Sequence, residues 1–132
     1  MAVTALIVDD SAVARRLASY HLRRAGCTVV GEAASAFEAL ESFHRLKPNI
    51  ITLDLVMPIK DEVDSMAVVR AVKKEVPETA IIVVSVIPSE KVQQDFFTEG
   101  VFGYVVKPFN DDALETLRPK LERAFPELAA HK

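Results

Sequence analysis

Five short apolar runs, each followed by a segment with helical periodicity, constrain the fold of this chain more than any other feature. The runs cover residues 5–8, 28–32, 50–53, 80–85 and 104–106, and the helical patterns cover residues 12–25, 36–46, 64–75, 91–99 and 111–124. The run of residues 28–32 becomes more polar towards its end, which predicts an edge strand. Strands that alternate with helices form a parallel sheet with right-handed crossovers and with helices on both faces. The pattern therefore predicts an α/β fold, doubly wound, with five parallel strands and five helices.

Length and composition exclude several classes of protein. A chain of 132 residues has the size of one domain. Its net charge of −3, without a basic block, predicts no direct contact with nucleic acid. The single cysteine, Cys27, excludes an internal disulfide and a cysteine-based zinc site. We expect no membrane contact and a cytoplasmic location, because the longest wholly apolar stretch is residues 80–84 and the first residues lack the basic region of a secretory signal.

The third apolar run ends in a carboxylate, Asp54, and Pro58 follows four residues later. Because proline lacks a backbone donor, it prevents both further strand pairing and a regular helix. In a parallel α/β sheet, the residue after a strand lies at the edge where such folds bind ligands. Taken alone, Asp54 is either a turn residue or part of a site.

The other predicted strands also end in polar residues. Asp9 and Asp10 follow the first run, Ser85 ends the fourth, and Lys107 follows the fifth. Because the carboxyl ends of parallel strands meet at one edge of the sheet, we expect these side chains to lie near Asp54. Ser85 and Lys107 are each compatible with a simple loop residue, but the joint arrangement predicts a functional site.

The charges of these side chains indicate a chemistry. Carboxylates about 4 Å apart repel each other by roughly 4 kcal/mol at an effective dielectric constant near 20, so such a cluster takes up a cation or protons. Oxygen ligands without cysteine or histidine favour Mg²⁺, Mn²⁺ or Ca²⁺. A divalent cation, the ammonium of Lys107 and the hydroxyl of Ser85 beside one carboxylate would suit phosphoryl transfer to that carboxylate.

The polar motifs resemble those of the receiver domains of response regulators, the CheY-like domains of two-component signalling. The motifs are Asp9-Asp10, Asp54-x-x-Met57-Pro58, Ser85 and Lys107-Pro108-Phe109, and the resemblance extends from Thr4 to Phe125. It implies a flavodoxin-like sheet with strand order 2-1-3-4-5, an order known for that family and not obtained from the spacing of the motifs. It also implies that residues 1–132 form a single receiver domain with no output domain in this chain.

The resemblance assigns roles to the acidic residues. Asp54 would be the phosphoacceptor. Asp10 and Asp54 would bind Mg²⁺ together with the main-chain carbonyl of Val56, and Asp9 would hold a water bound to the metal.

The resemblance also assigns a switch. Lys107 would contact the phosphoryl group, and Ser85 would move to form a hydrogen bond with it. Tyr104 matches the aromatic residue whose rotamer follows that hydroxyl. The movement would change the surface of the fourth helix, fifth strand and fifth helix, where partners would bind.

The implied function is that of a receiver that takes a phosphoryl group from a histidine kinase or a phosphotransfer protein. It would catalyse only its own Mg²⁺-dependent phosphorylation and dephosphorylation, and would act on a downstream effector or by dimerising when phosphorylated. Three alternatives remain: a pseudo-receiver that is not phosphorylated, the N-terminal receiver fragment of a larger regulator, and a Mg²⁺-dependent phosphatase. The phosphatase usually needs a second carboxylate two residues after the nucleophile, where this chain has Val56.

Three positions depart from the usual receiver pattern. Val86 stands after Ser85, where the family mostly has a small residue, and Asp61-Glu62 replaces the usual Asp-Gly. Pro119 lies inside the last predicted helix, where a proline is unfavourable.

The helical patterns also predict caps and buried positions. Ser35 and Asn110 are predicted to cap their helices, and Pro88 suits the first turn of the fourth helix. The apolar stripe of the first helix is predicted to comprise Ala14, Leu17, Ala18, His21 and Ala25, which places His21 at the edge of the core.

The adjacent residues Phe96 and Phe97 point about 100° apart on a helix and cannot both enter the core. Phe96 lies four residues after Val92, which predicts that Phe96 is the core residue. Phe97 is predicted to belong to an exposed partner surface.

Overall fold

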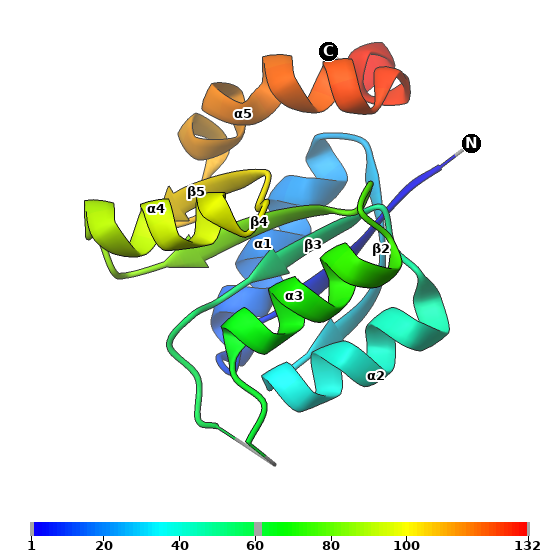
Figure 1. The fold of residues 1–132 in the computed structure, drawn as a ribbon. Helices are drawn as coiled ribbons and strands as arrows, with labels where there is room; N and C mark the ends of the chain where they lie inside the picture. Colours follow the sequence, from blue (N-terminus) through cyan, green and yellow to red (C-terminus); the bar gives the residue numbers. More distant parts are fainter. Residues whose placement is uncertain (1, 60–61, 132) are drawn as a thin grey trace.

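The structure, a computed structural model, describes residues 2–59 and 62–131. Within these residues it forms a five-stranded parallel sheet with the order β2-β1-β3-β4-β5 (Figure 1). The strands are β1 (Val3–Val8), β2 (Cys27–Ala33), β3 (Ile50–Leu53), β4 (Ala80–Ser85) and β5 (Gly103–Val106). The predicted α/β fold and strand order 2-1-3-4-5 are confirmed.

Helices cover both faces of the sheet (Figure 1). One face carries α1 (Ala12–Arg24), α5 (Asp111–Ala124) and the short 3-10 helix η1 (Pro126–His131). The other face carries α2 (Ala36–Leu46), α3 (Ser65–Glu75) and α4 (Glu90–Thr98). No helix within residues 2–59 and 62–131 combines the length and the apolar character that crossing a membrane requires.

Successive residues of the central strands enter two separate cores. In β1, Ala5 and Ile7 join the core under α1 and α5, whereas Leu6 and Val8 join the core under α2, α3 and α4. Because both faces are covered, a strand in this sheet is apolar on both sides. This explains why β3 and β4, which are buried along their whole length, appear in the sequence as nearly continuous apolar runs.

A polar side chain caps the start of each α-helix that the structure describes. Ser11, Ser35, Asp64, Ser89 and Asn110 each accept a hydrogen bond from the backbone N–H three residues later. The cap satisfies a donor that has no partner within the helix. The caps predicted at Ser35 and Asn110 are confirmed.

Several element boundaries differ from the prediction by one or two residues. β1 begins at Val3 and β5 at Gly103, and β2 is longer at both ends than predicted. These extra residues are paired with a neighbouring strand, as in the pair Val3 and Cys27, and pairing partners are not visible in a local pattern. The prediction that Pro88 lies in the first turn of α4 is wrong, because Ser89 caps the helix and Pro88 lies before the cap.

The buried face of α1 is rotated from its predicted position. Ala18, His21 and Ala25 are buried as predicted, but Leu22, which the prediction left out, is fully buried. Leu17 is 39% exposed, so its predicted place in the core is wrong. Two neighbouring apolar stripes are available on this helix, and only packing against the sheet determines which of them is buried.

The exposure of Phe96 and Phe97 gives a test of the core around α4. Phe96 is 8% exposed and Phe97 is 44% exposed, which confirms the predicted core position of Phe96. Phe96→Ala should lower the free energy of unfolding by about 3–5 kcal/mol, because it leaves a cavity. Phe97→Ala should lower it by less than about 1 kcal/mol. Urea unfolding of both variants measures the difference, and equal losses would contradict this assignment.

Candidate functional site

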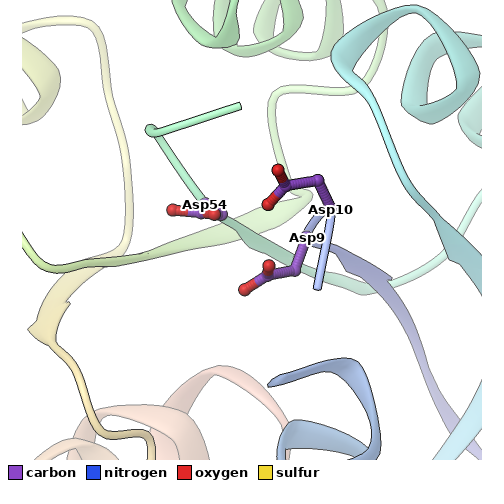
Figure 2. A group of neighbouring side chains, drawn as sticks. All are labelled: Asp9, Asp10 and Asp54. Carbon is purple, nitrogen blue, oxygen red and sulfur yellow. The ribbon is translucent and has the colours of Figure 1, made fainter. Parts of the chain in front are cut away.

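Three carboxylates meet at the carboxyl edge of the sheet. Asp9 and Asp10 follow β1, and Asp54 follows the neighbouring strand β3 (Figure 2). One oxygen of each carboxylate lies within 4.8 Å of the other two. Asp9 and Asp54 are buried, whereas Asp10 is exposed. The structure thus brings together the three aspartates that the sequence indicates.

Backbone hydrogen bonds extend the sheet to the residues of this site. The N–H of Asp54 donates to the carbonyl of Val8 on β1 at 2.9 Å, and the N–H of Asp9 donates to a carbonyl of β2 at 3.0 Å. The N–H of Lys107 donates to the carbonyl of Ser85 at 2.8 Å. The functional side chains are therefore attached to the ordered ends of strands, which holds their positions relative to one another.

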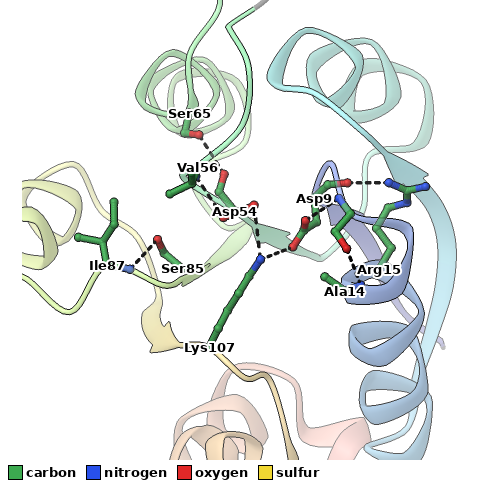
Figure 3. A network of polar contacts seen from close by, with 10 residues as sticks. Asp9, Ala14, Arg15, Asp54, Val56, Ser65, Ser85, Ile87 and Lys107 are labelled. Carbon is green, nitrogen blue, oxygen red and sulfur yellow. Dashed lines mark hydrogen bonds and ion pairs between the residues drawn. The ribbon is translucent and has the colours of Figure 1, made fainter.

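The ammonium of Lys107 lies between two of the carboxylates (Figure 3). Its Nζ is 2.8 Å from Oδ2 of Asp9 and 3.5 Å from Oδ2 of Asp54. Because both carboxylates are buried, dissolved salt screens these ion pairs less than it screens surface pairs. Within the part of the chain that the structure describes, this one ammonium faces three carboxylates, and the site keeps an excess of negative charge.

The pKa values reflect this crowding. Burial raises the pKa of the Asp54 carboxyl, and the charge of Asp9 raises it further. The N–H of Val56 and the ammonium of Lys107 lower that pKa without cancelling the increase. For Lys107, burial lowers the pKa, but the hydrogen bond with Asp9 and the charges of both carboxylates outweigh burial and raise it.

Asp54 is held by contacts to its side chain and its backbone. The N–H of Val56 donates to Oδ1 of Asp54 at 3.1 Å. The hydroxyl of Ser65, at the start of α3, donates to the backbone carbonyl of Asp54 at 3.0 Å (Figure 3). The sequence analysis missed Ser65, because no local pattern shows that the chain returns to Asp54 eleven residues later.

Asp9 is also fixed by its neighbours. The N–H of Ser11 donates to Oδ1 of Asp9 at 2.9 Å, and Nη1 of Arg15 donates to the backbone carbonyl of Asp9 at 2.8 Å. The Nε of Arg15 pairs with Glu32 on β2 at 2.8 Å. The sequence analysis missed Arg15 as well, although an arginine in the first turn after two aspartates is a signal that could have indicated it.

Ser85 and Tyr104 are connected through one residue that the sequence analysis missed. Ser85 is fully buried, and its Oγ accepts a hydrogen bond from the N–H of Ile87 at 3.2 Å. The hydroxyl of Tyr104 donates to the carbonyl of Ile87 at 2.7 Å. Ile87 therefore links the end of β4 to β5 and lies just before α4.

The departures from the receiver pattern have distinct structural consequences. Val86 is 61% exposed directly after the buried Ser85. Glu62 has a φ of 60°, a left-handed conformation that costs a residue with a side chain about 1–2 kcal/mol. Asp61 lies outside the described residues. Pro119 lies inside α5 as predicted, and the Lys107–Pro108 bond is cis.

The donor atoms of the site fit a hard divalent cation. Within the described residues, the cluster offers three carboxylates and neither cysteine nor histidine. Mg²⁺ prefers oxygen ligands, and the excess negative charge attracts it. Lys107 adds a fixed positive charge at the same edge, which can stabilise an anionic group such as a phosphoryl group.

The raised pKa of Asp54 predicts how an amide would behave in its place. The pKa of the Asp54 carboxyl is higher in the folded protein than in the unfolded chain. Its contribution to the free energy of unfolding is therefore fully present below the unfolded-state pKa and is lost as pH rises through the folded-state pKa. Asp54→Asn escapes this loss, because the amide stays neutral. The variant should be more stable than the wild type at pH 7 when a chelator is present.

Urea unfolding at pH 7 and pH 4 measures this effect. The advantage of Asp54→Asn should shrink at pH 4, where the wild-type carboxyl takes up a proton. The exposed Asp95 serves as a control, and Asp95→Asn should give no such gain. An Asp54→Asn variant that is no more stable than the wild type at pH 7 would contradict the expected cost of burying this charge.

Comparison with known proteins identifies the family. Residues 5–117 match the profile of the response regulator receiver domain. The chemotaxis protein CheY of Thermotoga maritima is 35% identical over 104 residues, which cover 79% of this chain and 84% of that protein. CheY of Bacillus subtilis is 31% identical over 122 residues, covering 92% of this chain and 99% of that protein.

Solved structures agree with this match. The chemotaxis response regulator CheY4 of Vibrio cholerae has a TM-score of 0.77 and 29% identity, and the alignment covers 95% of this chain and all of that one. The profile match and the identities above 30% span most of the chain. We conclude that the chain belongs to the response regulator receiver domains, the CheY-like signalling modules of two-component systems.

Proposed function

We propose that this receiver accepts a phosphoryl group on Asp54 and passes the signal to a partner protein through the surface of α4, β5 and α5. The observation that carries the proposal is the cluster of Asp9, Asp10 and Asp54 with the Lys107 ammonium close to two of them. A carboxylate nucleophile beside a fixed cation is what phosphoryl transfer to protein requires. We take residues 1–132 as one receiver unit, acting in the cytoplasm.

In the proposed reaction, an oxygen of Asp54 attacks the phosphorus of a phosphohistidine on a histidine kinase or a phosphotransfer protein. A P–O bond forms while the P–N bond breaks, and the departing imidazole takes up a proton from solvent. Water later attacks the aspartyl phosphate, which restores the Asp54 carboxylate and releases inorganic phosphate. The receiver would thus catalyse only its own phosphorylation and dephosphorylation.

Oxygen donors at the edge of the sheet would hold Mg²⁺. Asp10, Asp54 and the main-chain carbonyl of Val56 would be direct ligands, and Asp9 would act through a water ligand. The ion supplies positive charge that balances the carboxylates and the phosphoryl oxygens. The raised pKa of Asp54 means that its surroundings favour the protonated carboxyl. A bound cation would favour the ionised form, which acts as the nucleophile.

Lys107 and Ser85 would stabilise the phosphoryl group itself. The Nζ of Lys107 is 3.5 Å from Oδ2 of Asp54, which places a positive charge next to the proposed nucleophile. Ser85 ends β4, the strand beside β3, and its hydroxyl would donate to a phosphoryl oxygen. Both groups would stabilise the negative charge that phosphorylation adds at Asp54.

The contacts of Ile87 support a route from Asp54 to the partner surface. A phosphoryl group that draws the Ser85 hydroxyl toward it would weaken the bond from the Ile87 N–H to Ser85. The carbonyl of Ile87 holds the Tyr104 hydroxyl, so a change at Ile87 would reach β5 and the start of α4 together. Phe97 lies half-exposed on α4 and would form part of the surface that a downstream effector, or a second receiver, contacts.

Acetyl phosphate should phosphorylate Asp54 in the presence of Mg²⁺, because the small donor needs only the nucleophile and the stabilising charges. Mass spectrometry should show one added phosphoryl group in the wild type and none in Asp54→Ala. Asp64→Ala, which changes an exposed aspartate at the cap of α3, should retain labelling. Labelling that persists in Asp54→Ala or with a chelator would contradict the assignment, and no labelling of any protein would favour a pseudo-receiver.

Asp10→Asn should weaken Mg²⁺ binding by at least about tenfold, because it removes the charge of a proposed ligand. Ser85→Ala should change the affinity by less than about twofold, since Ser85 is not a proposed ligand. Calorimetric titration of the unphosphorylated proteins with Mg²⁺ measures both effects. If Ser85→Ala had the larger effect, the proposed division of roles would be wrong.

Tyr104→Phe should uncouple phosphorylation from the start of α4, because it removes the hydroxyl that binds Ile87. Acetyl phosphate should still label Asp54 in this variant. The changes in amide NMR shift of Ile87 and of residues 89–92 on phosphorylation should be smaller than in the wild type. Wild-type shifts in the variant would show that the signal does not pass through this contact.

A further inference from the structure

Two of the proposed Mg²⁺ ligands lie within one short turn after β3. They are the carboxylate of Asp54 and the main-chain carbonyl of Val56, two residues later. The N–H of Val56 donates to Oδ1 of Asp54 at 3.1 Å, so the side chain of Asp54 folds back over this turn. The directions of the carboxylate and of the carbonyl therefore depend on the same peptide groups, those that join residues 54–56.

Ser65 holds the first of these peptide groups (Figure 3). Its hydroxyl donates to the backbone carbonyl of Asp54 at 3.0 Å, and the residue is only 7% exposed. Because a peptide group is planar, a bond that holds this carbonyl also fixes the direction of the N–H of Leu55. On the other side of Asp54, its own N–H donates to the carbonyl of Val8 at 2.9 Å. The backbone of Asp54 is thus held from β1 and from α3 at the same time.

The place of Ser65 in α3 leaves its hydroxyl available for this contact. Ser65 is the first residue of the helix, and the cap is Asp64, whose Oδ1 accepts a hydrogen bond from the N–H of Ala67 at 2.8 Å. Val68 and Val69 are fully buried in the core beneath the helix, which fixes the start of α3 relative to the sheet. The hydroxyl of Ser65 is therefore not needed as the cap, and the packing of α3 keeps it at Asp54.

We propose that Ser65 is a positioning residue for the acidic site, through which α3 holds the turn of residues 54–56 in the geometry that binds a cation. The inference rests on the proposed function, since it concerns the proposed ligands Asp54 and Val56. Mg²⁺ demands a nearly ideal octahedral arrangement of oxygen ligands, so a small rotation of the turn lowers the affinity. Groups that orient the ligands of a metal without binding it commonly contribute about ten- to hundredfold to its affinity.

Ser65→Ala provides the test, because it takes the hydroxyl away from the buried carbonyl of Asp54. Calorimetric titration should show Mg²⁺ binding that is weaker than in the wild type by about tenfold or more. A second measurement needs no metal. In the protein without Mg²⁺, the amide proton of Val56 should move towards the NMR shift of an amide without a hydrogen bond, because the turn no longer keeps it at Oδ1 of Asp54.

Two variants provide the controls. Ser65→Thr keeps the hydroxyl, so its Mg²⁺ affinity should lie within about twofold of that of the wild type. Ser42→Ala makes the same change as Ser65→Ala at a buried serine of α2, outside the acidic cluster, and should also stay within about twofold. Circular dichroism checks that each variant is folded. A general loss of stability would affect both alanine variants, whereas a positioning role is specific to Ser65 and is restored by threonine.

Each contrary result has one meaning. If the wild type binds Mg²⁺ and Ser65→Ala binds it equally well, the positioning role is wrong while the proposed function stands. Equal weakening in Ser42→Ala, or a folded Ser65→Thr that binds as weakly as Ser65→Ala, would also overturn the positioning role. A wild type that binds no Mg²⁺ would contradict the proposed function itself, and the amide shift of Val56 would then decide whether Ser65 holds the turn.

Discussion

The ammonium of Lys107 stands 2.8 Å from Asp9 and 3.5 Å from Asp54, and the geometry of the site depends on this pair of contacts. Two carboxylates about 4 Å apart repel each other by roughly 4 kcal/mol at an effective dielectric constant of 20, and burial increases that cost. Lys107 offsets part of the repulsion. Burial, together with the charge of Asp9, raises the pKa of the Asp54 carboxyl, and the excess negative charge of the site attracts cations.

The parallel sheet makes these contacts available. Asp9 follows β1, Asp54 follows β3 and Lys107 follows β5, so residues from distant parts of the chain meet only because the strands point in the same direction. Apolar side chains on both faces of β3 and β4 hold those strands between two layers of helices. The charged side chains of the site thus lie at the carboxyl edge of the sheet, just after the strands.

Sequence reasoning succeeded where one local pattern had one physical meaning. The uninterrupted apolar run of residues 80–84 indicates a strand that is buried on both faces, and β4 has the predicted bounds, Ala80–Ser85. It failed where two local solutions had similar energies. Both Leu17 and Leu22 suit the buried side of α1, and Pro88 is compatible with the first helical turn or with the residue before the cap.

The contacts that complete the site could not be predicted from the local sequence for a related reason. The hydroxyl of Ser65 donates to the backbone carbonyl of Asp54 from eleven residues away. Ile87 connects Ser85 to Tyr104 through its own backbone groups, which every residue has. The role of Ile87 therefore comes from its position, and the hydroxyl of Ser65 matters because the fold brings it to Asp54.

The sequence by itself determined the alternation of strands and helices, and it placed three aspartates, a serine and a lysine directly after or at the ends of strands. Those properties depend on hydrophobic periodicity and on side-chain chemistry, which are written in the order of residues. Only the tertiary structure decided which carboxylates lie within 4.8 Å and which of them Lys107 pairs with. These distances depend on the packing of the helices and strands, because Asp54 and Lys107 come from segments far from Asp9 and Asp10 in the sequence.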